Sequence, residues 1–282
     1  MGGGMAANQA RAGRKVIAFD LSDKAMKAAE KHGCEMAQSA AQAVAAADIV
    51  ITMLPAGKHV RAVYAAEILP NAKPGTLLID CSTIDVDSAR AVAQLAMEAG
   101  FRAADAPVSG GTAAAEGGTL AFMVGCAETD YDEIDEALGP MSKAVFRAGE
   151  SGAGQAAKIC NNMLLGIHMI GTCEAFALAE KLGLDAKNFH QIAEASSGQN
   201  WSLSSYTPVK GVGAESPADR GFDGGFATDM MLKDLRLAKD AAMANGGVTP
   251  LGGQAEALYA LLSASGDGGK DFSSIIRMLK GK

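Results

Sequence analysis

Three polar side chains near the start of a long apolar segment could hold a substrate and move a proton. Residues 151–182 form this segment, and Lys158, Asn161 and Asn162 stand in its second turn if it is helical. Residues i, i+3 and i+4 share one face of a helix, so these groups project together. A lysine and two amides in apolar surroundings are costly unless something pairs with them, and a substrate is one such partner. The alternative is a helix end near the surface, with the Lys158 ammonium reaching water.

A second set of small, polar or glycine residues follows short apolar runs that resemble buried strands. These positions are Asp20, Leu54 with Pro55, Ser82 with Thr83, and Ser109 with Gly110 and Gly111. In an open parallel sheet, ligands bind at the carboxyl ends of the strands. Each position alone is explained by ordinary turn chemistry. Four such strand ends together predict a ligand site along one edge of a sheet.

Asp20 suggests which ligand this edge binds. In a dinucleotide-binding sheet, an acidic residue at the end of this strand accepts hydrogen bonds from the adenosine ribose hydroxyls, and its charge repels the 2′-phosphate of NADP. Gly2, Gly3 and Gly4 lie upstream at about the distance expected of a glycine-rich turn that binds phosphate at a helix start. The sequence therefore favours NAD over NADP.

The elements that must position these residues divide the chain into two parts. Strand-like runs at 15–20, 48–54, 76–80, 101–105, 120–124 and 144–147 alternate with helix-like segments at 24–31, 57–66, 85–98 and 130–138. This alternation predicts an α/β domain with a mostly parallel sheet covered on both faces. After Gly149 the pattern is helical, at 151–182, 186–195, 227–245, 250–264 and 271–280, with an ordered loop over 196–226. We predict domains 1–150 and 151–282. Because apolar residues surround segment 151–182 on all sides, we expect it to be buried.

Composition excludes several classes of function. The formal net charge of -7 and the lack of a basic run argue against nucleic acid or an anionic membrane as partner. The helix over 151–182 is a poor membrane span because Asn161, Asn162, His168 and Glu174 interrupt it. We find no signal peptide, and five scattered cysteines with four scattered histidines predict neither disulfides nor a metal site. A cytoplasmic protein with reduced thiols is the expectation.

Several motifs, in the correct order over nearly the whole chain, resemble those of the β-hydroxyacid dehydrogenases. Segment 105–111 (Asp-Ala-Pro-Val-Ser-Gly-Gly) resembles the substrate-binding motif, and 154–162 (Gly-Gln-Ala-Ala-Lys-Ile-Cys-Asn-Asn) resembles the catalytic motif. Segment 80–85 resembles the nicotinamide-side loop. Phe226 and Lys233 with the next two residues resemble the pair that completes the cofactor pocket. Segment 196–202 and the loop to Gly225 favour the branch that acts on 3-hydroxyisobutyrate.

The resemblance implies a role for each matching residue. Lys158 is the catalytic lysine and Asn162 holds the substrate, whose carboxylate meets Ser109, Gly110 and Gly111. The residues expected to line the cofactor are Gly2, Asp20, Leu54, Pro55, Thr83, Phe226 and Lys233. A free lysine is a poor base, with a pKa of about 10.4, so we expect burial beside a cationic nicotinamide to lower the pKa of Lys158.

The fold and reaction follow from the same resemblance. We expect a Rossmann-type doubly wound sheet, apparently without its first strand, joined by a long central helix to an all-α domain. The expected reaction is NAD-dependent oxidation of (S)-3-hydroxyisobutyrate to methylmalonate semialdehyde in valine degradation, by a homodimer or homotetramer. The alternatives are reduction of tartronate or succinic semialdehyde, and a catalytically silent protein that binds ligands or partner subunits.

The start of the chain departs from the family pattern. The family opens with an apolar strand and a turn of the form G-x-G-x-M-G, of which Met1 and Gly2 match only the last two positions. Either the native chain is longer, or its cofactor site is damaged. We favour a longer chain, because the other site residues are intact. Loss of a central buried strand should also cost more free energy than the net stability of a domain, which is about 5–15 kcal/mol. Gly4 stands where the family commonly has proline, at some cost in helix stability.

Overall fold

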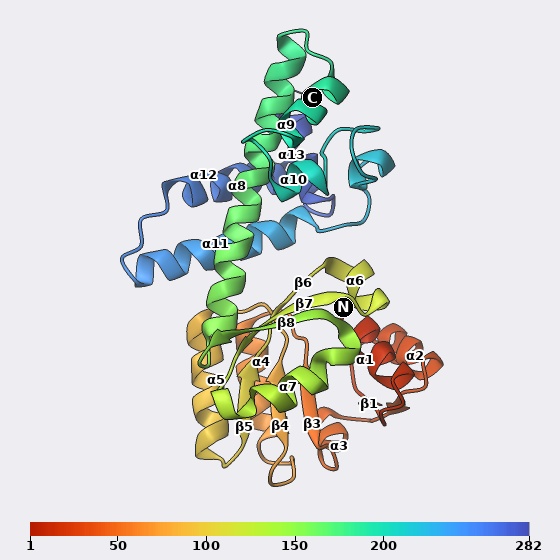
Figure 1. Cartoon of the computed structure of the whole chain (residues 1–282). Coiled ribbons are helices and arrows are strands. Elements are labelled where there is room, and N and C mark those ends of the chain that lie inside the picture. Colours follow the sequence, from red (N-terminus) through yellow and green to blue (C-terminus); the bar gives the residue numbers. More distant parts are fainter. Residues whose placement is uncertain (282) are drawn as a thin grey trace. The chain divides into compact units, whose positions relative to one another are not determined.

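A computed structural model describes residues 1–281 and shows two compact units, Met1–Lys158 and the chain from Ile159 onward (Figure 1). The first unit is an α/β body and the second is helical. Each unit has its own hydrophobic core, so each is described separately below.

The first unit is built on a six-stranded sheet in the order β3-β4-β5-β7-β6, with β8 also paired to β7. Its strands are β3 (Ile49–Thr52), β4 (Leu77–Asp80), β5 (Arg102–Asp105), β6 (Val108–Ser109), β7 (Leu120–Gly125) and β8 (Ser142–Gly149). β3, β4 and β5 run parallel in register, whereas β7 runs antiparallel to β5 and β6. β1 (Ile17–Ala18) and β2 (Glu35–Met36) form a separate parallel pair. The sheet is therefore mostly parallel, as expected, but the direction of β7 was not predicted.

Both faces of this sheet are covered, as the sequence predicted. Leu77 and Ile79 of β4 pack in a core that includes Met5, whereas Leu78 between them packs in a second core with Tyr64. The helices that supply these cores are α1 (Gly2–Arg11), α3 (Ala40–Val44), α4 (Gly57–Val63), α5 (Val86–Glu98), α6 (Gly111–Gly117) and α7 (Tyr131–Leu138). Helix α2 (Asp23–Lys31) also belongs to this unit. The alternation of side chains along a strand explains why a fully buried β4 serves two cores.

Helix α8 (Ala153–Lys181) begins in the first unit and continues into the second. The other helices of the second unit are α9 (Ala186–Glu194), α10 (Trp201–Ser204), α11 (Thr228–Ala244), α12 (Pro250–Leu262) and α13 (Ile275–Leu279). Their shared core contains Met169, Phe176, Leu235 and Tyr259. The helices predicted over 151–182, 186–195, 227–245 and 250–264 are present, whereas 271–280 is a 3-10 turn (Phe272–Ser274) followed by the five-residue α13.

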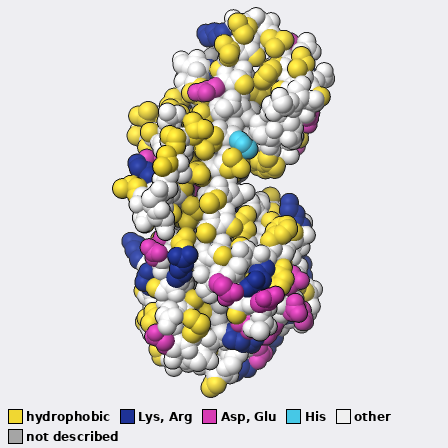
Figure 2. Space-filling model, turned by 60° about the vertical axis from the view of Figure 1, so that its left-hand side comes forward, with side chains coloured by type: hydrophobic (Ala, Val, Ile, Leu, Met, Phe, Trp, Pro, Cys, Tyr) yellow, Lys and Arg dark blue, Asp and Glu magenta, His cyan; other side chains and the backbone are white. Residues whose placement is uncertain are grey.

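The expected burial of α8 on all sides is wrong for the single chain. Leu164 is 51% exposed and Leu178 is 59% exposed, although Met169 and Cys173 on the same helix are fully buried. Figure 2 shows hydrophobic side chains over much of the visible face of the helical unit. An all-round apolar pattern shows that a helix avoids water, but it does not show whether its own chain provides the cover.

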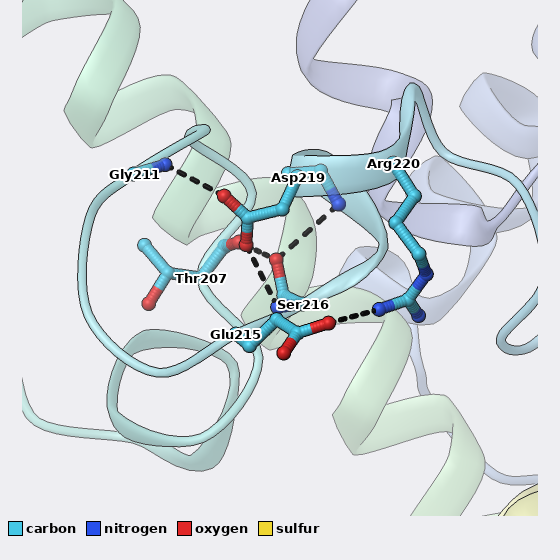
Figure 3. Close-up of polar contacts among 7 residues, drawn as sticks. Thr207, Gly211, Glu215, Ser216, Asp219 and Arg220 are labelled. Atoms are coloured by element: carbon cyan, nitrogen blue, oxygen red, sulfur yellow. Dashed lines mark hydrogen bonds and ion pairs between the residues drawn. The ribbon is translucent and has the colours of Figure 1, made fainter.

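The segment that joins α10 to α11 is ordered by hydrogen bonds rather than by regular structure (Figure 3). The Ser216 hydroxyl accepts from the backbone N–H of Ala218, and the Asp219 carboxylate accepts from the N–H groups of Ser216 and Gly211. The Ser216 hydroxyl also donates to the Thr207 carbonyl at 2.7 Å. This is a capping box at the start of a 3-10 turn, and it supports the prediction of an ordered loop.

Candidate active site

The ends of β3 and β4 are joined by a buried hydrogen-bond network. Asp80, the last residue of β4, accepts from the hydroxyls of Thr52 and Ser82 through one carboxylate oxygen, at 2.7 and 2.6 Å. The Ser82 hydroxyl in turn accepts from the backbone N–H of Leu54 at 2.7 Å. Burial raises the pKa of Asp80, and the bonds from Ser82 and Thr52 oppose that rise. The network fixes Leu54, and hence Pro55 after it, beside the loop that carries Thr83.

The start of α8 is attached to this loop by one side chain. Gln155 is fully buried, and its amide donates to the Ser82 carbonyl at 2.7 Å. The amide oxygen accepts from the backbone N–H of Ile84 at 3.0 Å. Both peptide groups that flank Thr83 are therefore bonded to the helix. Lys158 follows Gln155 by three residues, about one helical turn, and is only 7% exposed.

Asp105, at the end of β5, holds the same helix end from the sheet. Its carboxylate accepts from the N–H groups of Gly152 and Gln155 at 2.6 and 2.8 Å. A carboxylate there satisfies helix-start donors and faces the positive end of the helix dipole. Burial raises the pKa of Asp105 to about 6, with a further upward contribution from the charge of Asp80, although the two N–H bonds lower it.

Ser109, Gly110 and Gly111 form the turn from β6 into α6. Gly110 has a φ of 133° and Gly111 has a φ of 72°, both in a region that L side chains rarely adopt. The turn begins a seven-residue helix, α6, that sequence analysis missed because glycines bound a short run of small residues. The peptide groups of this turn are the ones at which we predict that the substrate carboxylate binds.

The residues predicted to bind the phosphates and the adenosine ribose of NAD, Gly2 and Asp20, lie at the amino end of α1 and after β1. Gly2 is the first residue of α1, and Asp20 is exposed two residues beyond β1. One Asp20 oxygen accepts from the backbone N–H of Ser22 at 2.8 Å. Close packing explains the glycine at position 4. A Cβ there would lie 2.8 Å from the backbone of Ala115 in α6, so a bulkier residue would separate α1 from α6.

The second unit places the remaining predicted residues around two buried carboxylates. Asn162 on α8 donates through its amide to Asp234 on α11 at 2.5 Å, and the Lys233 ammonium lies 3.8 Å from the same carboxylate. Asn161 donates to the Asn162 amide oxygen at 3.0 Å. The backbone N–H of Phe226 donates to Asp271 at 2.7 Å. Within residues 159–281, Asn162 and Lys233 therefore share one buried carboxylate, while Phe226 is held separately.

Sequence reasoning missed the residues that hold the others in place. Asp80, Asp105, Gln155 and Asp234 stood inside the quoted motifs, but no role was given to them. The available signal was a carboxylate at the end of an apolar strand, which needs hydrogen-bond donors once it is buried. Among residues 1–281, no cluster of three or more His, Cys, Asp or Glu side chains could hold a metal ion.

Two family descriptions match the chain along almost its whole length. Residues 1–149 match the NAD binding domain of 6-phosphogluconate dehydrogenase. Residues 152–279 match the family described as NAD-binding of NADP-dependent 3-hydroxyisobutyrate dehydrogenase.

Curated relatives and a solved structure agree with these matches. The chain is 46% identical to the 3-hydroxyisobutyrate dehydrogenase of Pseudomonas aeruginosa, over 100% of this chain and 96% of the relative. It is 45% identical to the NAD-dependent L-serine dehydrogenase of the same bacterium, over 99% and 94%. The structure of Mycobacterium tuberculosis 3-hydroxyisobutyrate dehydrogenase with L-serine superposes with a TM-score of 0.96 at 45% identity, covering 99% of this chain and 96% of that one.

Proposed function

The chain belongs to the 3-hydroxyisobutyrate dehydrogenase family of NAD-dependent β-hydroxyacid dehydrogenases, and from that premise we propose that it oxidises (S)-3-hydroxyisobutyrate to methylmalonate semialdehyde. The observation that supports this most directly is the buried Lys158 on a helix bonded to both peptide groups around Thr83. The expected step lies in valine degradation.

The first unit has the chemistry that NAD requires. Asp20 presents a carboxylate that suits ribose hydroxyls, and α1 presents backbone N–H groups at its glycine-rich start. Leu54, Pro55 and Thr83 follow the ends of β3 and β4 and would line the nicotinamide half. We assign Phe226 and Lys233 of the second unit to the same cofactor. When bound, NAD supplies the acceptor for the hydride of the alcohol carbon.

The chain's own groups would bind the hydroxy acid and take its proton. Ser109, Gly110 and Gly111 would bind the carboxylate through the Ser109 hydroxyl and backbone N–H groups. Asn162, oriented by Asp234, would hold the substrate, and Lys158 would accept the hydroxyl proton as general base. In the reverse direction, Lys158 would return that proton to the carbonyl oxygen. The second polar amide, Asn161, is left with a supporting role.

Replacement of Lys158 tests this assignment. We expect Lys158→Ala to lower kcat by about 10²–10⁴-fold, the usual contribution of a general base, with NAD binding and circular dichroism unchanged. Lys143→Ala removes an exposed lysine of β8 and should leave kcat as it is. Turnover by Lys158→Ala within a few-fold of the unmodified enzyme would contradict the proposal.

L-serine is the second candidate substrate, and it was not among the sequence-based alternatives. Its support is a curated L-serine dehydrogenase that is as similar to this chain as several 3-hydroxyisobutyrate dehydrogenases are. Both compounds are short 3-hydroxy acids, so one site could bind either. Measuring kcat/KM for 3-hydroxyisobutyrate, L-serine, tartronate semialdehyde and succinic semialdehyde ranks these compounds as substrates. The proposal requires 3-hydroxyisobutyrate to have the highest value.

We also propose that the enzyme is a cytoplasmic homodimer or homotetramer. All five cysteines are free thiols, as expected in a reducing compartment. Large apolar side chains on the helical unit are exposed in the single chain, among them Leu164, Leu178, Leu182 and Leu261. Exposed apolar patches of this kind mark protein interfaces.

A further inference from the structure

Gln155 is a fully buried side chain whose two polar ends both bond to the loop around Thr83. The Nε2 group donates to the Ser82 carbonyl and the Oε1 atom accepts from the Ile84 N–H. Thr83 is thus bracketed by two hydrogen bonds that originate from one amide. No other side-chain type of this length offers a donor and an acceptor together without carrying charge at neutral pH.

The two parts that Gln155 joins are each fixed independently. On the loop side, Ser82 is bonded to Asp80 and to the Leu54 N–H. On the helix side, the Asp105 carboxylate accepts from the backbone N–H of Gln155 itself. The Gln155 amide is therefore a cross-link between two anchored parts, and its length sets the spacing between them.

A second buried glutamine shows that burial alone does not produce this arrangement. Gln9 of α1 donates to the Ala137 carbonyl at 2.7 Å, but its amide oxygen has no hydrogen-bond partner. Gln9 thus joins two helices through one bond, which is sufficient for packing. Gln155 uses both ends, and both bonds reach a loop to which cofactor contact is assigned.

We propose that Gln155 is a positioning residue for the dehydrogenase reaction, which sets the spacing between the Thr83 loop and the helical turn that carries Lys158. The inference rests on the proposed roles of Lys158 and Thr83. Reaction rates depend steeply on such spacing, and a displacement of about 1 Å can cost about 100-fold. Gln155 would therefore act on turnover more than on the affinity for either substrate.

The decisive variant is Gln155→Met, which keeps the side-chain length and loses both bonds. We expect kcat to fall about 10- to 100-fold, while the KM values for NAD and the hydroxy acid change less than about threefold. In the protein without ligands, hydrogen exchange of a peptide covering residues 82–85 should become faster, because the Ile84 N–H loses its acceptor. Gln9→Met is the control for loss of a buried glutamine amide: its kcat and the exchange of residues 82–85 should stay unchanged, and the Ala137 carbonyl that it frees keeps the Arg14 guanidinium as a donor.

Gln155→Glu adds a second measurement, the pH dependence of kcat, which would not change if Gln155 had a purely structural role. A protonated carboxyl reproduces the donor and acceptor of the amide, whereas the carboxylate loses the donor toward Ser82. The kcat of this variant relative to the unmodified enzyme should therefore rise as the pH falls. Asp80, Asp105 and Lys158 are titratable groups close to this link and are present in both proteins, so the ratio reports the titration of residue 155 together with its coupling to them.

The outcomes separate the inference from the proposed function. An unchanged kcat in Gln155→Met, with Lys158→Ala inactive, overturns the inference alone. An equal loss of kcat in Gln9→Met also overturns it, because general destabilisation then explains the effect. Turnover that survives Lys158→Ala overturns the proposed function first. If Gln155→Met does not fold, a flat pH ratio for Gln155→Glu counts against the inference.

Discussion

At the scale of single residues, buried carboxylates hold the predicted site residues in place. Asp80, Asp105, Asp234 and Asp271 are each at most 4% exposed, and each accepts from at least one donor. Burying a charge without partners is costly, so each position requires its donors. Replacement of one of these carboxylates should therefore also displace the predicted site residues that its hydrogen bonds hold, directly or through a neighbouring residue.

Asp105 makes a testable contribution to the pH dependence of stability. Its pKa of about 6 in the folded chain exceeds the ordinary value of 3.8, so the folded state binds the proton more tightly than the unfolded state. The free energy of unfolding should thus fall as the pH rises from about 4 to about 6, by at most about 3 kcal/mol from this group. Asp105→Asn should remove that slope, measured by urea unfolding at several pH values. An identical slope in both proteins would contradict the raised pKa.

Asp20 should decide which dinucleotide is used. Asp20→Ser removes the charge that repels a 2′-phosphate, so we expect the ratio of kcat/KM for NADP to that for NAD to rise about 10- to 100-fold. Asp23→Ser, three residues later at the start of α2, removes another exposed carboxylate and serves as control. A ratio that moves equally in both variants would count against the role of Asp20.

At the scale of elements, the first turn of α8 approaches β5 and β7 so closely that only glycine fits at two positions. A Cβ at Gly154 would collide with the carbonyl oxygens of Met123 and Asp105, and one at Gly125 would collide with the Asp105 carboxylate. These atoms belong to the backbone or to a bonded carboxylate, so they cannot move aside cheaply. The glycines are what allow Asp105 to reach the helix start.

Two glycine substitutions on α8 should therefore have opposite effects. Gly154→Ala should destabilise the protein by about 1–3 kcal/mol through overpacking, and should lower kcat by moving the turn that carries Lys158. Gly171→Ala, where a Cβ meets nothing within 4 Å of its own chain, should stabilise the helix of the single chain by about 0.5–1 kcal/mol, and it is measured with the oligomer dissociated because Gly171 shares a helix face with Leu164 and Leu178. Denaturant unfolding measures both changes. Destabilisation of the same size by Gly171→Ala would show that the cost lies in the helix and not in the contact with the sheet.

The elements also show where sequence reasoning reaches its limit. The positions of β3, β4 and β5 and of the helices between them were predicted from the apolar runs, because strands that are buried on both faces consist almost entirely of apolar residues. An apolar run does not indicate whether its strand is parallel or antiparallel to its neighbour, so the antiparallel pairing of β7 with β5 was missed. The strand ends and Lys158 were found from residue types, whereas Gln155 was missed because its bonds join residues more than 70 positions apart.

At the scale of the whole molecule, α8 is long and apolar enough to cross a membrane by length and composition, and 44% of its apolar window is buried. The family match gives this helix another role, as the connection between an NAD-binding unit and a helical unit. In the proposed oligomer, another copy of the chain rather than lipid covers its exposed leucines.

Light scattering tests this assignment directly. We expect a mass of at least about twice the 28.7 kDa of one chain. Replacing Leu178 and Leu182 by Glu should lower the mass, because two charges would be buried in the interface. Met97→Glu, at an exposed apolar position of the first unit, should leave the mass unchanged. A monomeric unmodified protein would contradict the proposed oligomer.

The bonded loop around Ser216 has a consequence for proteolysis. Lys210 and Arg220 are exposed, and their chemistry suits trypsin, yet the backbone beside each is tied into the capping box, with Gly211 bonded to Asp219. A protease must draw the chain into an extended form, which requires these bonds to open first. The lifetime of this glycine-rich segment in the cell is then governed by its opening equilibrium, and not by its composition or exposure.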